Sequence, residues 1–210
     1  MQDDAVPADY RAAVPFPSPP WQLRAQAWVS LFAVRSAGAG RPAGMYGAAL
    51  VDYVEGGVLT YHELLVARLL QDGHVARLRV TDIWVDSPES MHGGRSLWAI
   101  PKELAHLPLQ DRTAGPVSRT TFSGVADGQH LASGAFTSVP GAALVRWPFV
   151  AAADQERPDG SAVLTPLNGS ARAVPCLGTW RFEPTGPLAF LHGRRPLMSL
   201  RLVDARLRFG

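Results

Sequence analysis

The stretch Gly94-Arg95-Ser96-Leu97-Trp98-Ala99-Ile100-Pro101-Lys102-Glu103-Leu104-Ala105 contains the only lysine of a 210-residue chain. The chain has 20 basic residues, and the other 19 are arginines. Arginine stays protonated in proteins, whereas a desolvated lysine can lose its proton and become a nucleophilic amine. The lone lysine therefore indicates either a chemical role for its amine or a composition bias that spared Lys102 by chance.

The residues before Lys102 favour the chemical role. Four apolar residues, 97–100, precede Pro101, which fixes its own backbone and biases Ile100 towards an extended conformation. A lysine held behind such a run is a candidate for burial. Burial disfavours the ammonium form and lowers a lysine pKa by up to about 3–5 units when it is complete. We therefore expect a desolvated amine at position 102.

The pattern Gly94-Arg95-x-Leu97-x-Ala99-x-Pro101-Lys102-x-Leu104 resembles the active-site segment of the acetoacetate decarboxylase-like superfamily. Members of that superfamily attack a keto acid with a lysine that follows a proline. The resemblance implies that Lys102 is a Schiff-base lysine. It also implies a mainly β (α+β) fold, an antiparallel β-barrel or cone with a few short helices and Lys102 in its interior cavity, assembled as a homo-oligomer.

Two further residues, Glu63 and Arg24, are assigned roles by the same resemblance, and Arg95 is a candidate because it lies close to the lysine. Tyr61-His62-Glu63 matches the strand that carries an active-site glutamate, so Glu63 is the second catalytic candidate; the alternative is a solvated residue or an ion pair with an arginine. Arg24 is similar to an N-terminal arginine near the substrate carboxylate. Arg95 either holds that carboxylate or pins the loop before the lysine.

Trp98 is a candidate for the substrate pocket on its residue type alone. A tryptophan in this position either belongs to the core or lines an apolar pocket. Both interpretations stay open, and we include Trp98 among the substrate-binding candidates.

The chain departs from the decarboxylases proper at one position. Those enzymes usually carry a second lysine directly after the first, and this chain has Glu103 there. A carboxylate facing Lys102 would favour the ammonium, whereas consecutive strand residues point to opposite faces, which would turn Glu103 away. Acetoacetate as the substrate therefore does not follow from the resemblance, while the Schiff base does.

Composition limits the organisation of the chain and its partners. With 210 residues and 47% hydrophobic content, we expect one domain over residues 21–210, preceded by a proline-rich arm over residues 1–20. The net charge of +2 and the scattered arginines indicate neither nucleic acid nor a membrane as partner. A single cysteine excludes an internal disulfide, and no stretch has the pattern of a signal peptide, so we expect a cytoplasmic protein.

Short apolar or alternating runs separated by glycine, proline and aspartate predict an all-β pattern with one helix. Asp127-Gly128 and Gly56-Gly57 are typical of tight turns, and a helix is expected to start at Asp86 or Ser87. The segment 165–172 is similar to a hairpin of the superfamily. The expected strands cover residues 25–35, 45–54, 58–70, 74–85, 117–126, 129–138, 161–167, 170–182 and 197–209.

Other kinds of site find little support in the sequence. The six histidines lack the paired spacing of zinc ligands, and the glycine pairs lack the residues of a phosphate loop. No serine lies in a nucleophile elbow. We therefore expect no metal or nucleotide cofactor.

Three function hypotheses remain. The first is a Schiff-base lyase acting on a β-keto or α-keto acid, by decarboxylation or related aldol or dehydration chemistry. The second is an enzyme of natural-product biosynthesis that uses the barrel for a larger apolar substrate without a Schiff base; many pocket aromatics and few pocket charges would favour it. The third is a non-catalytic small-molecule binding module, which a protonated, ion-paired Lys102 would favour.

Overall fold

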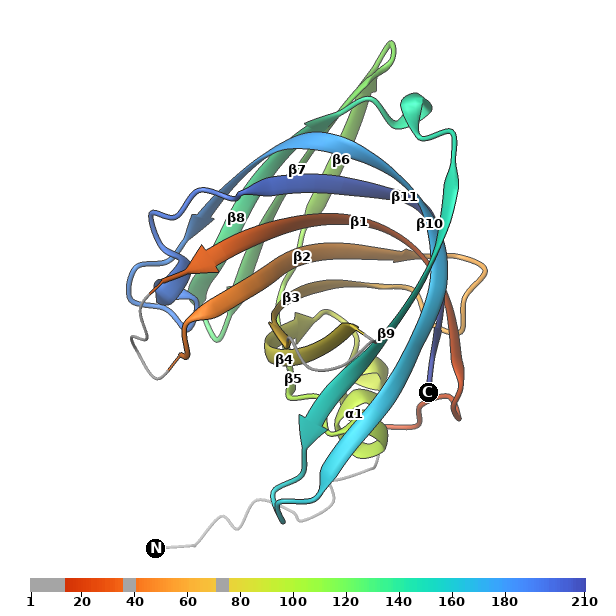
Figure 1. Ribbon diagram of the computed structural model, residues 1–210, viewed down its shortest axis with the longest axis vertical. Helices are drawn as coiled ribbons and strands as arrows, with labels where there is room; N and C mark the ends of the chain where they lie inside the picture. Colours follow the sequence, from red (N-terminus) through yellow and green to blue (C-terminus); the bar gives the residue numbers. More distant parts are fainter. Residues whose placement is uncertain (1–13, 36–40, 71–75) are drawn as a thin grey trace, which may run out of the picture.

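The computed structural model describes residues 14–35, 41–70 and 76–210. Strands dominate it, and one α-helix and two short 3₁₀ helices interrupt them (Figure 1). In chain order the elements are β1 (Trp21–Val34), β2 (Gly44–Val54), β3 (Tyr61–Leu70), β4 (Ala76–Val85), α1 (Pro88–Trp98), β5 (Lys102–Leu104), β6 (Leu109–Ala114), β7 (Val117–Ala126), β8 (Gln129–Ser138), η2 (Pro140–Ala142), β9 (Arg146–Glu156), β10 (Ala162–Phe182), η3 (Ala189–Leu191) and β11 (Met198–Phe209).

Seven strands close into a barrel. Neighbours pair in the order β11, β1, β2, β3, β4, β9, β10, and β10 pairs in turn with β11. The pairings are antiparallel except that of β4 with β9, where residues 76–78 run parallel to residues 151–153. The predicted barrel is therefore confirmed, and the short parallel contact is where it closes.

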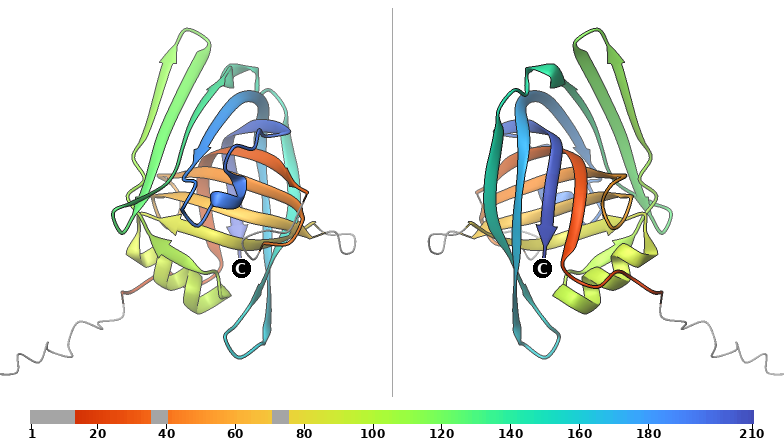
Figure 2. Two further views of the ribbon diagram at one scale, coloured as in Figure 1. Left: turned by 90° about the vertical axis from the view of Figure 1, so that its left-hand side faces the viewer. Right: turned by 90° about the vertical axis from the view of Figure 1, so that its right-hand side faces the viewer.

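The second half of β10 leaves the barrel and starts another layer. Residues 167–175 pair with β11, whereas residues 176–182 pair with β8, which continues through β7 to β6. Figure 2 shows the β6–β7 hairpin projecting at one end of the molecule, while α1 and the β9–β10 hairpin lie at the other. The extra layer covers the outer face of β1–β3.

The strands β1–β3 are consequently buried on both faces. Trp28, Leu50 and Leu64 belong to a core cluster between these strands and the extra layer. Trp21 and Ala49 belong to a second cluster inside the barrel. Burial on both faces explains why these strands contain long apolar runs instead of a clean alternation.

The tight turn at Asp127-Gly128 and the start of the helix were predicted correctly, whereas Gly56-Gly57 lies in a longer connection between Val54 and Tyr61. Asp127 and Gly128, with φ of 48° and 74°, form the two-residue turn between β7 and β8. Positive φ at both central residues is typical of the turn that suits the twist of a hairpin. Ser87 caps α1 as predicted, accepting a hydrogen bond from the Ser90 backbone N at 3.1 Å.

The prediction for residues 165–172 was wrong. These residues lie inside β10, which runs unbroken from Ala162 to Phe182, and the hairpin that reverses the chain is the one between β9 and β10. The sequence pattern predicted two shorter strands here, over residues 161–167 and 170–182, with Asn168-Gly169 between them. The strands β6 and β9 were not expected, and β5 was considered only in the argument about Glu103.

The predicted N-terminal arm lies partly outside the described residues, which begin at 14. Of its described part, Phe16 packs against the core inside the barrel, and the Pro17 carbonyl accepts a hydrogen bond from Trp21 Nε1 at 2.8 Å. The division into arm and single domain stays a prediction.

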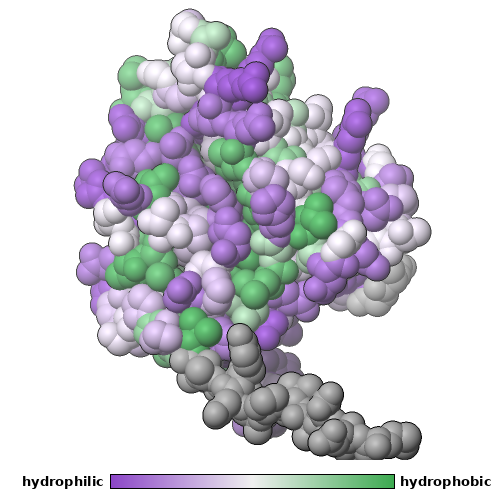
Figure 3. Space-filling view, turned by 180° about the vertical axis from the view of Figure 1, so that it is seen from behind, coloured by the Kyte–Doolittle hydropathy of each residue, from purple (hydrophilic) through white to green (hydrophobic). Residues whose placement is uncertain are grey.

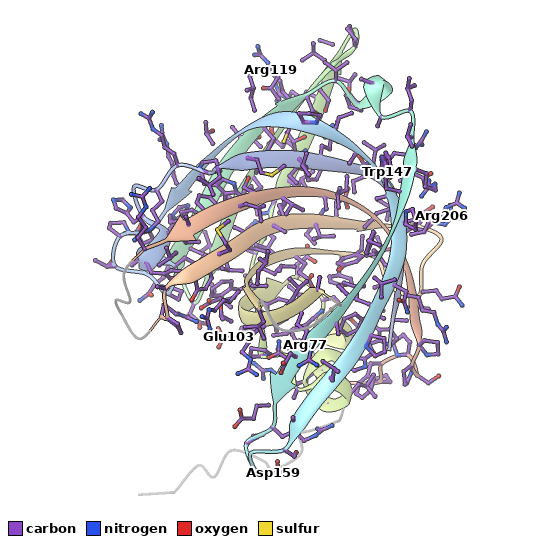
Figure 4. The ribbon with its side chains drawn as sticks, in the orientation of Figure 1. Arg77, Glu103, Arg119, Trp147, Asp159 and Arg206 are labelled. Atoms are coloured by element: carbon purple, nitrogen blue, oxygen red, sulfur yellow. The ribbon has the colours of Figure 1, made fainter. Side chains whose placement is uncertain are left out.

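The outer surface mixes polar and apolar residues. On the face shown in Figure 3, small groups of hydrophobic residues alternate with hydrophilic ones. Arg206 and Trp147 are exposed and point outward from the barrel wall (Figure 4). Within the described ranges, no helix has the length and apolar content needed to cross a bilayer.

Candidate active site

Lys102 enters the barrel through a short strand placed by α1. The helix ends at Ala99, whose φ of 54° turns the chain, and Ile100 N donates to Gly94 O at 3.1 Å. Pro101 follows, and β5 then pairs in parallel with β4, Lys102 lying opposite Ile83. The predicted position of the lysine, directly after the helix and against a sheet, is confirmed.

Glu63 reaches the same interior from β3. It lies opposite Val85 of β4, two residues from Ile83. Residues two apart on a strand share a face, so Glu63 and Lys102 approach each other across β4 from its two neighbouring strands.

One face of α1 is shaped around the lysine. Ser90, Gly94 and Trp98 are buried and spaced by four residues, which places them on one side of the helix. A Cβ added at Gly94 would lie 2.7 Å from Lys102 Cδ. The lysine stem therefore needs glycine at this position.

The Lys102 ammonium has three polar neighbours. Nζ lies 2.8 Å from Glu63 Oε2, 2.9 Å from Ser90 Oγ and 3.4 Å from Tyr61 Oη. Lys102 is 4% exposed and Glu63 3%, so the pair is removed from solvent. A salt bridge in this position is screened little by salt.

The pair reverses the predicted direction of the lysine pKa. Burial lowers the pKa of Lys102, but the charge of Glu63, followed by Tyr61 and their hydrogen bonds, raises it, and the net direction is upward from 10.5. The amine is desolvated as expected, yet the expected fall in its pKa was wrong because a carboxylate faces it. In the resting protein Lys102 is an ammonium.

Two stacked tyrosines complete the polar group. The rings of Tyr53 and Tyr61 lie 4.3 Å apart, and Tyr53 Oη donates to Glu63 Oε1 at 3.2 Å. Burial, and then the charge of Glu63, raises the pKa of Tyr53 well above 10. Burial also raises the pKa of Tyr61. Both phenols are therefore neutral at physiological pH and can donate hydrogen bonds.

A cavity of about 130 Å³ adjoins these groups inside the barrel. Its only charged lining residues, among those described, are Glu63 and Lys102. The rest of its wall is aromatic or aliphatic. The lining residues are Trp21, Leu23, Tyr53, Tyr61, Glu63, Leu65, Ala67, Leu78, Val80, Ile83, Trp98, Ile100, Lys102, Ala153, Leu167, Leu207 and Phe209.

The structure separates the five candidate site residues. Lys102, Glu63 and Trp98 line the cavity together. Arg24 and Arg95 are exposed and line no part of it. Arg95 Nε instead donates to the Lys102 carbonyl at 2.5 Å, which is the loop-pinning alternative. The expectation that either arginine lies beside a bound substrate is therefore corrected.

Glu103 does not take part in the site. It follows Lys102 on β5 but is exposed at the outer edge of the molecule (Figure 4). The alternation of strand side chains predicted this. The carboxylate that acts on Lys102 is Glu63.

Sequence reasoning missed Tyr53, Tyr61 and Ser90. Tyr61 lies two residues before Glu63 and so shares its face, a signal that was present in the sequence. Tyr53 is the cross-strand partner of Tyr61, which only the register of β2 and β3 reveals. Ser90 carried no signal beyond its place in the first turn of a helix.

In the part of the chain that the structure describes, no three His, Cys, Asp or Glu side chains are grouped as a metal site. Comparisons by sequence also give nothing: no family model and no curated protein matches the chain. Neither finding assigns a function.

Solved structures do match over nearly the whole chain. MppR, an enduracididine biosynthesis enzyme solved with pyruvate, superposes with a TM-score of 0.63 at 15% identity, covering 96% of this chain and 92% of that one. Acetoacetate decarboxylase from Legionella pneumophila gives 0.61 at 11% identity, covering 99% and 95%. An acetoacetate decarboxylase-like enzyme from Sphingomonas wittichii gives 0.59 at 12%, covering 90% of each.

These superpositions include the barrel, and they cover at least 90% of this chain and of each matched chain. At such low identity it establishes the fold and not the reaction. The chain therefore has the acetoacetate decarboxylase-like fold that the Gly94 to Leu104 pattern predicted.

Proposed function

We propose that the protein is a Schiff-base enzyme that makes or breaks carbon–carbon bonds in a small carbonyl substrate. The observation that carries this proposal is the buried Lys102 amine in a cavity, 2.8 Å from the Glu63 carboxylate. The fold supports it, since MppR has been solved with pyruvate and with a condensation product of pyruvate and an aldehyde.

The first step is a proton transfer. The raised pKa leaves Lys102 as an ammonium, which cannot attack a carbonyl. Glu63 Oε2 is within the distance at which a carboxylate accepts a proton directly. The free amine then adds to the substrate carbonyl carbon, and Glu63 returns the proton to the oxygen, which gives a carbinolamine. Glu63 next carries a second proton from the nitrogen to the hydroxyl, and water leaves as the iminium forms.

The second step uses the resulting iminium as an electron sink. Loss of carbon dioxide, of an α-proton or of an aldehyde from the substrate each gives the same enamine. Glu63 is placed to take or return the proton that each route requires. Decarboxylation, aldol chemistry and dehydration are therefore variants of one mechanism on this site.

Ser90 and Tyr61 assist by hydrogen bonding. Both oxygens lie within 3.4 Å of Nζ, where the carbinolamine hydroxyl would form. Tyr53 holds the other oxygen of Glu63, which leaves Oε2 free for proton transfer. Trp98 serves as an apolar wall.

A non-catalytic binding module is the second candidate, and the ion pair of Lys102 favours it. An aromatic cavity with few charges also agrees with an enzyme for an apolar substrate that forms no Schiff base. The size of the cavity argues against a large substrate, because about 130 Å³ is below the roughly 300–1,000 Å³ typical of sites for drug-sized ligands.

Borohydride trapping tests the proposal. The folded protein is incubated with pyruvate or with acetoacetate, reduced, and analysed by intact mass and peptide mapping. We expect a stable adduct on the peptide that contains Lys102. Since the chain has one lysine, the only other amine that can react is the N-terminus.

The control for the trapping experiment is a variant that lacks both charges of the ion pair, so that the cavity has no net charge. Lys102→Ala alone leaves the Glu63 charge buried without its partner, so the double variant Lys102→Met, Glu63→Gln is the better comparison. It should fold and give no adduct in the cavity. An unmodified Lys102 in the folded wild-type protein with pyruvate, acetoacetate and a neutral ketone such as butanone would reject the Schiff base and leave the binding module.

A further inference from the structure

The charges of the cavity limit what it can bind. Glu63 and Lys102 neutralise each other, so the cavity has no net charge. A keto acid would bring a carboxylate into this space. Burying that anion is costly unless a cation and hydrogen bonds receive it.

No such cation lines the cavity among residues 14–35, 41–70 and 76–210. Arg24 and Arg95 lie outside it. Arg201 is buried, but it does not line the cavity and is bonded to Asp111 at 2.8 Å and to Gln26 at 2.6 Å. Among these residues Lys102 is therefore the one cation available to a substrate carboxylate, and it is already paired with Glu63.

Imine formation does not provide an additional positive charge for the carboxylate of a bound keto acid. An ammonium and a neutral carbonyl give an iminium and water, so the positive charge stays on the lysine nitrogen beside Glu63. With a neutral carbonyl the cavity remains neutral at every step. With a keto acid it carries one uncompensated negative charge, and Glu63 repels it.

We propose that the substrate class is a small uncharged aldehyde or ketone with an apolar substituent, and not a keto acid. This inference rests on the proposed Schiff base. The apolar wall of Trp21, Trp98, Leu207 and Phe209 would hold the substituent, and the volume of about 130 Å³ admits only a few carbon atoms beyond the carbonyl.

The corresponding lyase reaction is cleavage of a neutral β-hydroxy carbonyl compound. Lys102 forms the iminium with release of water, and Glu63 takes the hydroxyl proton. The bond between the α and β carbons breaks, its electron pair moves to the iminium as an enamine, and an aldehyde leaves. Glu63 returns the proton to the α-carbon, and water hydrolyses the new iminium. The reverse sequence is an aldol addition.

The test compares pyruvate with pyruvamide, which has the same shape and no charge. Initial rates of borohydride-trapped adduct on Lys102 are measured for each and divided by the rates with n-butylamine, which corrects for the reactivity of the carbonyl itself. Butanone is included as an apolar ketone. We expect the corrected rate with pyruvamide to exceed that with pyruvate at least tenfold, and butanone to be trapped.

A variant tests the cause of the preference. Glu63→Gln removes the repelling carboxylate, so the iminium on Lys102 is left as a cation for pyruvate, and the ratio of corrected rates should fall towards one or below. A corrected rate with pyruvate equal to or above that with pyruvamide in the wild-type protein would overturn the neutral-substrate inference while keeping the Schiff base. Failure of all three carbonyls to form an adduct would overturn both.

Discussion

The Glu63 carboxylate both restrains and serves Lys102. It raises the pKa of the lysine, which makes the free amine scarce at neutral pH, and it is also the nearest group that can accept the proton. A proton acceptor already hydrogen-bonded to the nucleophile is the usual arrangement for activation. The ion pair is therefore compatible with the proposed Schiff base, although it lowers the fraction of the protein in which Lys102 is a free amine.

The pH dependence of imine formation should report the effect of Glu63 on the pKa of Lys102. In the wild-type protein the trapped rate with butanone should rise with pH through the alkaline range, because the pKa of Lys102 is raised above 10.5. In Glu63→Gln, burial remains and lowers the pKa, so the midpoint should move to lower pH. Each pKa unit changes the free-amine fraction about tenfold below the midpoint.

Glu103→Gln is the matched control for that experiment. It removes a carboxylate adjacent to Lys102 in the chain but exposed on the outside. Its pH midpoint should equal that of the wild-type protein. Equal midpoints in the wild-type protein and Glu63→Gln would contradict the role given to the Glu63 charge.

The site residues were predictable to the extent that local pattern decides them. The lone lysine behind an apolar run and a proline, together with the resemblance of the segment, made Lys102 the first candidate, and the run made it a candidate for burial, which the structure shows. The direction of its pKa was not, because it depends on a residue 39 positions away in the chain that only the pairing of β3, β4 and β5 brings into contact. Arg24 and Arg95 were misplaced for the same reason, since local sequence does not say which face of a barrel wall a charge occupies.

At the scale of elements, the helix α1 contains two neighbouring glycines, Gly93 and Gly94, which pack against different side chains. A Cβ at Gly93 would lie 2.5 Å from Trp21 Cζ2, whereas a Cβ at Gly94 would lie 2.7 Å from Lys102 Cδ. Glycine in a helix interior costs about 1 kcal/mol relative to alanine. Glycine at position 93 therefore leaves space for the Trp21 ring, and glycine at position 94 leaves space for the Lys102 side chain.

The two alanine variants should consequently fail in different ways. Gly93→Ala overpacks an aromatic ring in the barrel core and should reduce the free energy of unfolding by about 1–3 kcal/mol, less the gain in helix propensity. It should still form the Lys102 adduct when folded. Gly94→Ala should fold with a smaller loss but displace the lysine stem and reduce the trapped rate at least tenfold.

Denaturant unfolding and borohydride trapping on the same two samples check this pair. The wild-type rate measured per folded molecule is the reference. A Gly94→Ala protein that traps as fast as the wild type would refute the close fit between helix and lysine.

Strands were predicted best where only one face of the strand is buried or where a two-residue turn bounds it. The β7–β8 hairpin follows from Asp127-Gly128 between alternating runs. The strand β10 could not be predicted as one element, because Asn168-Gly169 interrupts its apolar pattern and because it exchanges its partners near residue 176. The strand β9 was missed because its alanines, residues 151–153, give a weak strand signal, although Ala152 and Ala153 are buried.

At the scale of the molecule, three buried groups of the site link stability to pH. The pKa values of Tyr53, Tyr61 and Lys102 are all raised in the folded protein. Above about pH 10 the unfolded chain therefore releases protons that the folded protein still holds. The contribution of these groups is complete below that pH and is lost as pH rises, so the free energy of unfolding should fall.

Denaturant unfolding between pH 8 and pH 11 measures this fall. The loss should be roughly 1 kcal/mol for each pKa unit by which a group is raised and titrated over that range. Tyr53→Phe removes one of the three groups and should give a shallower decline. An unfolding free energy that is flat or rising above pH 10 would contradict the assignment.

The assembly of the chain stays a prediction. The resemblance implies a homo-oligomer, and the described structure is one chain. The barrel nevertheless has all the groups of the proposed mechanism within it, since Lys102, Glu63, Ser90 and both tyrosines come from β2, β3, β5 and α1 of the same chain.

The burial of the only lysine has a practical consequence for watching this protein move. Reagents that acylate side-chain amines find none on the surface of the described fold, and they reach Lys102 only inside the barrel. The rate of acylation at that single position therefore reports how accessible the interior of the barrel is. Lys102 can therefore be used to follow access to the barrel interior without adding a label to the protein.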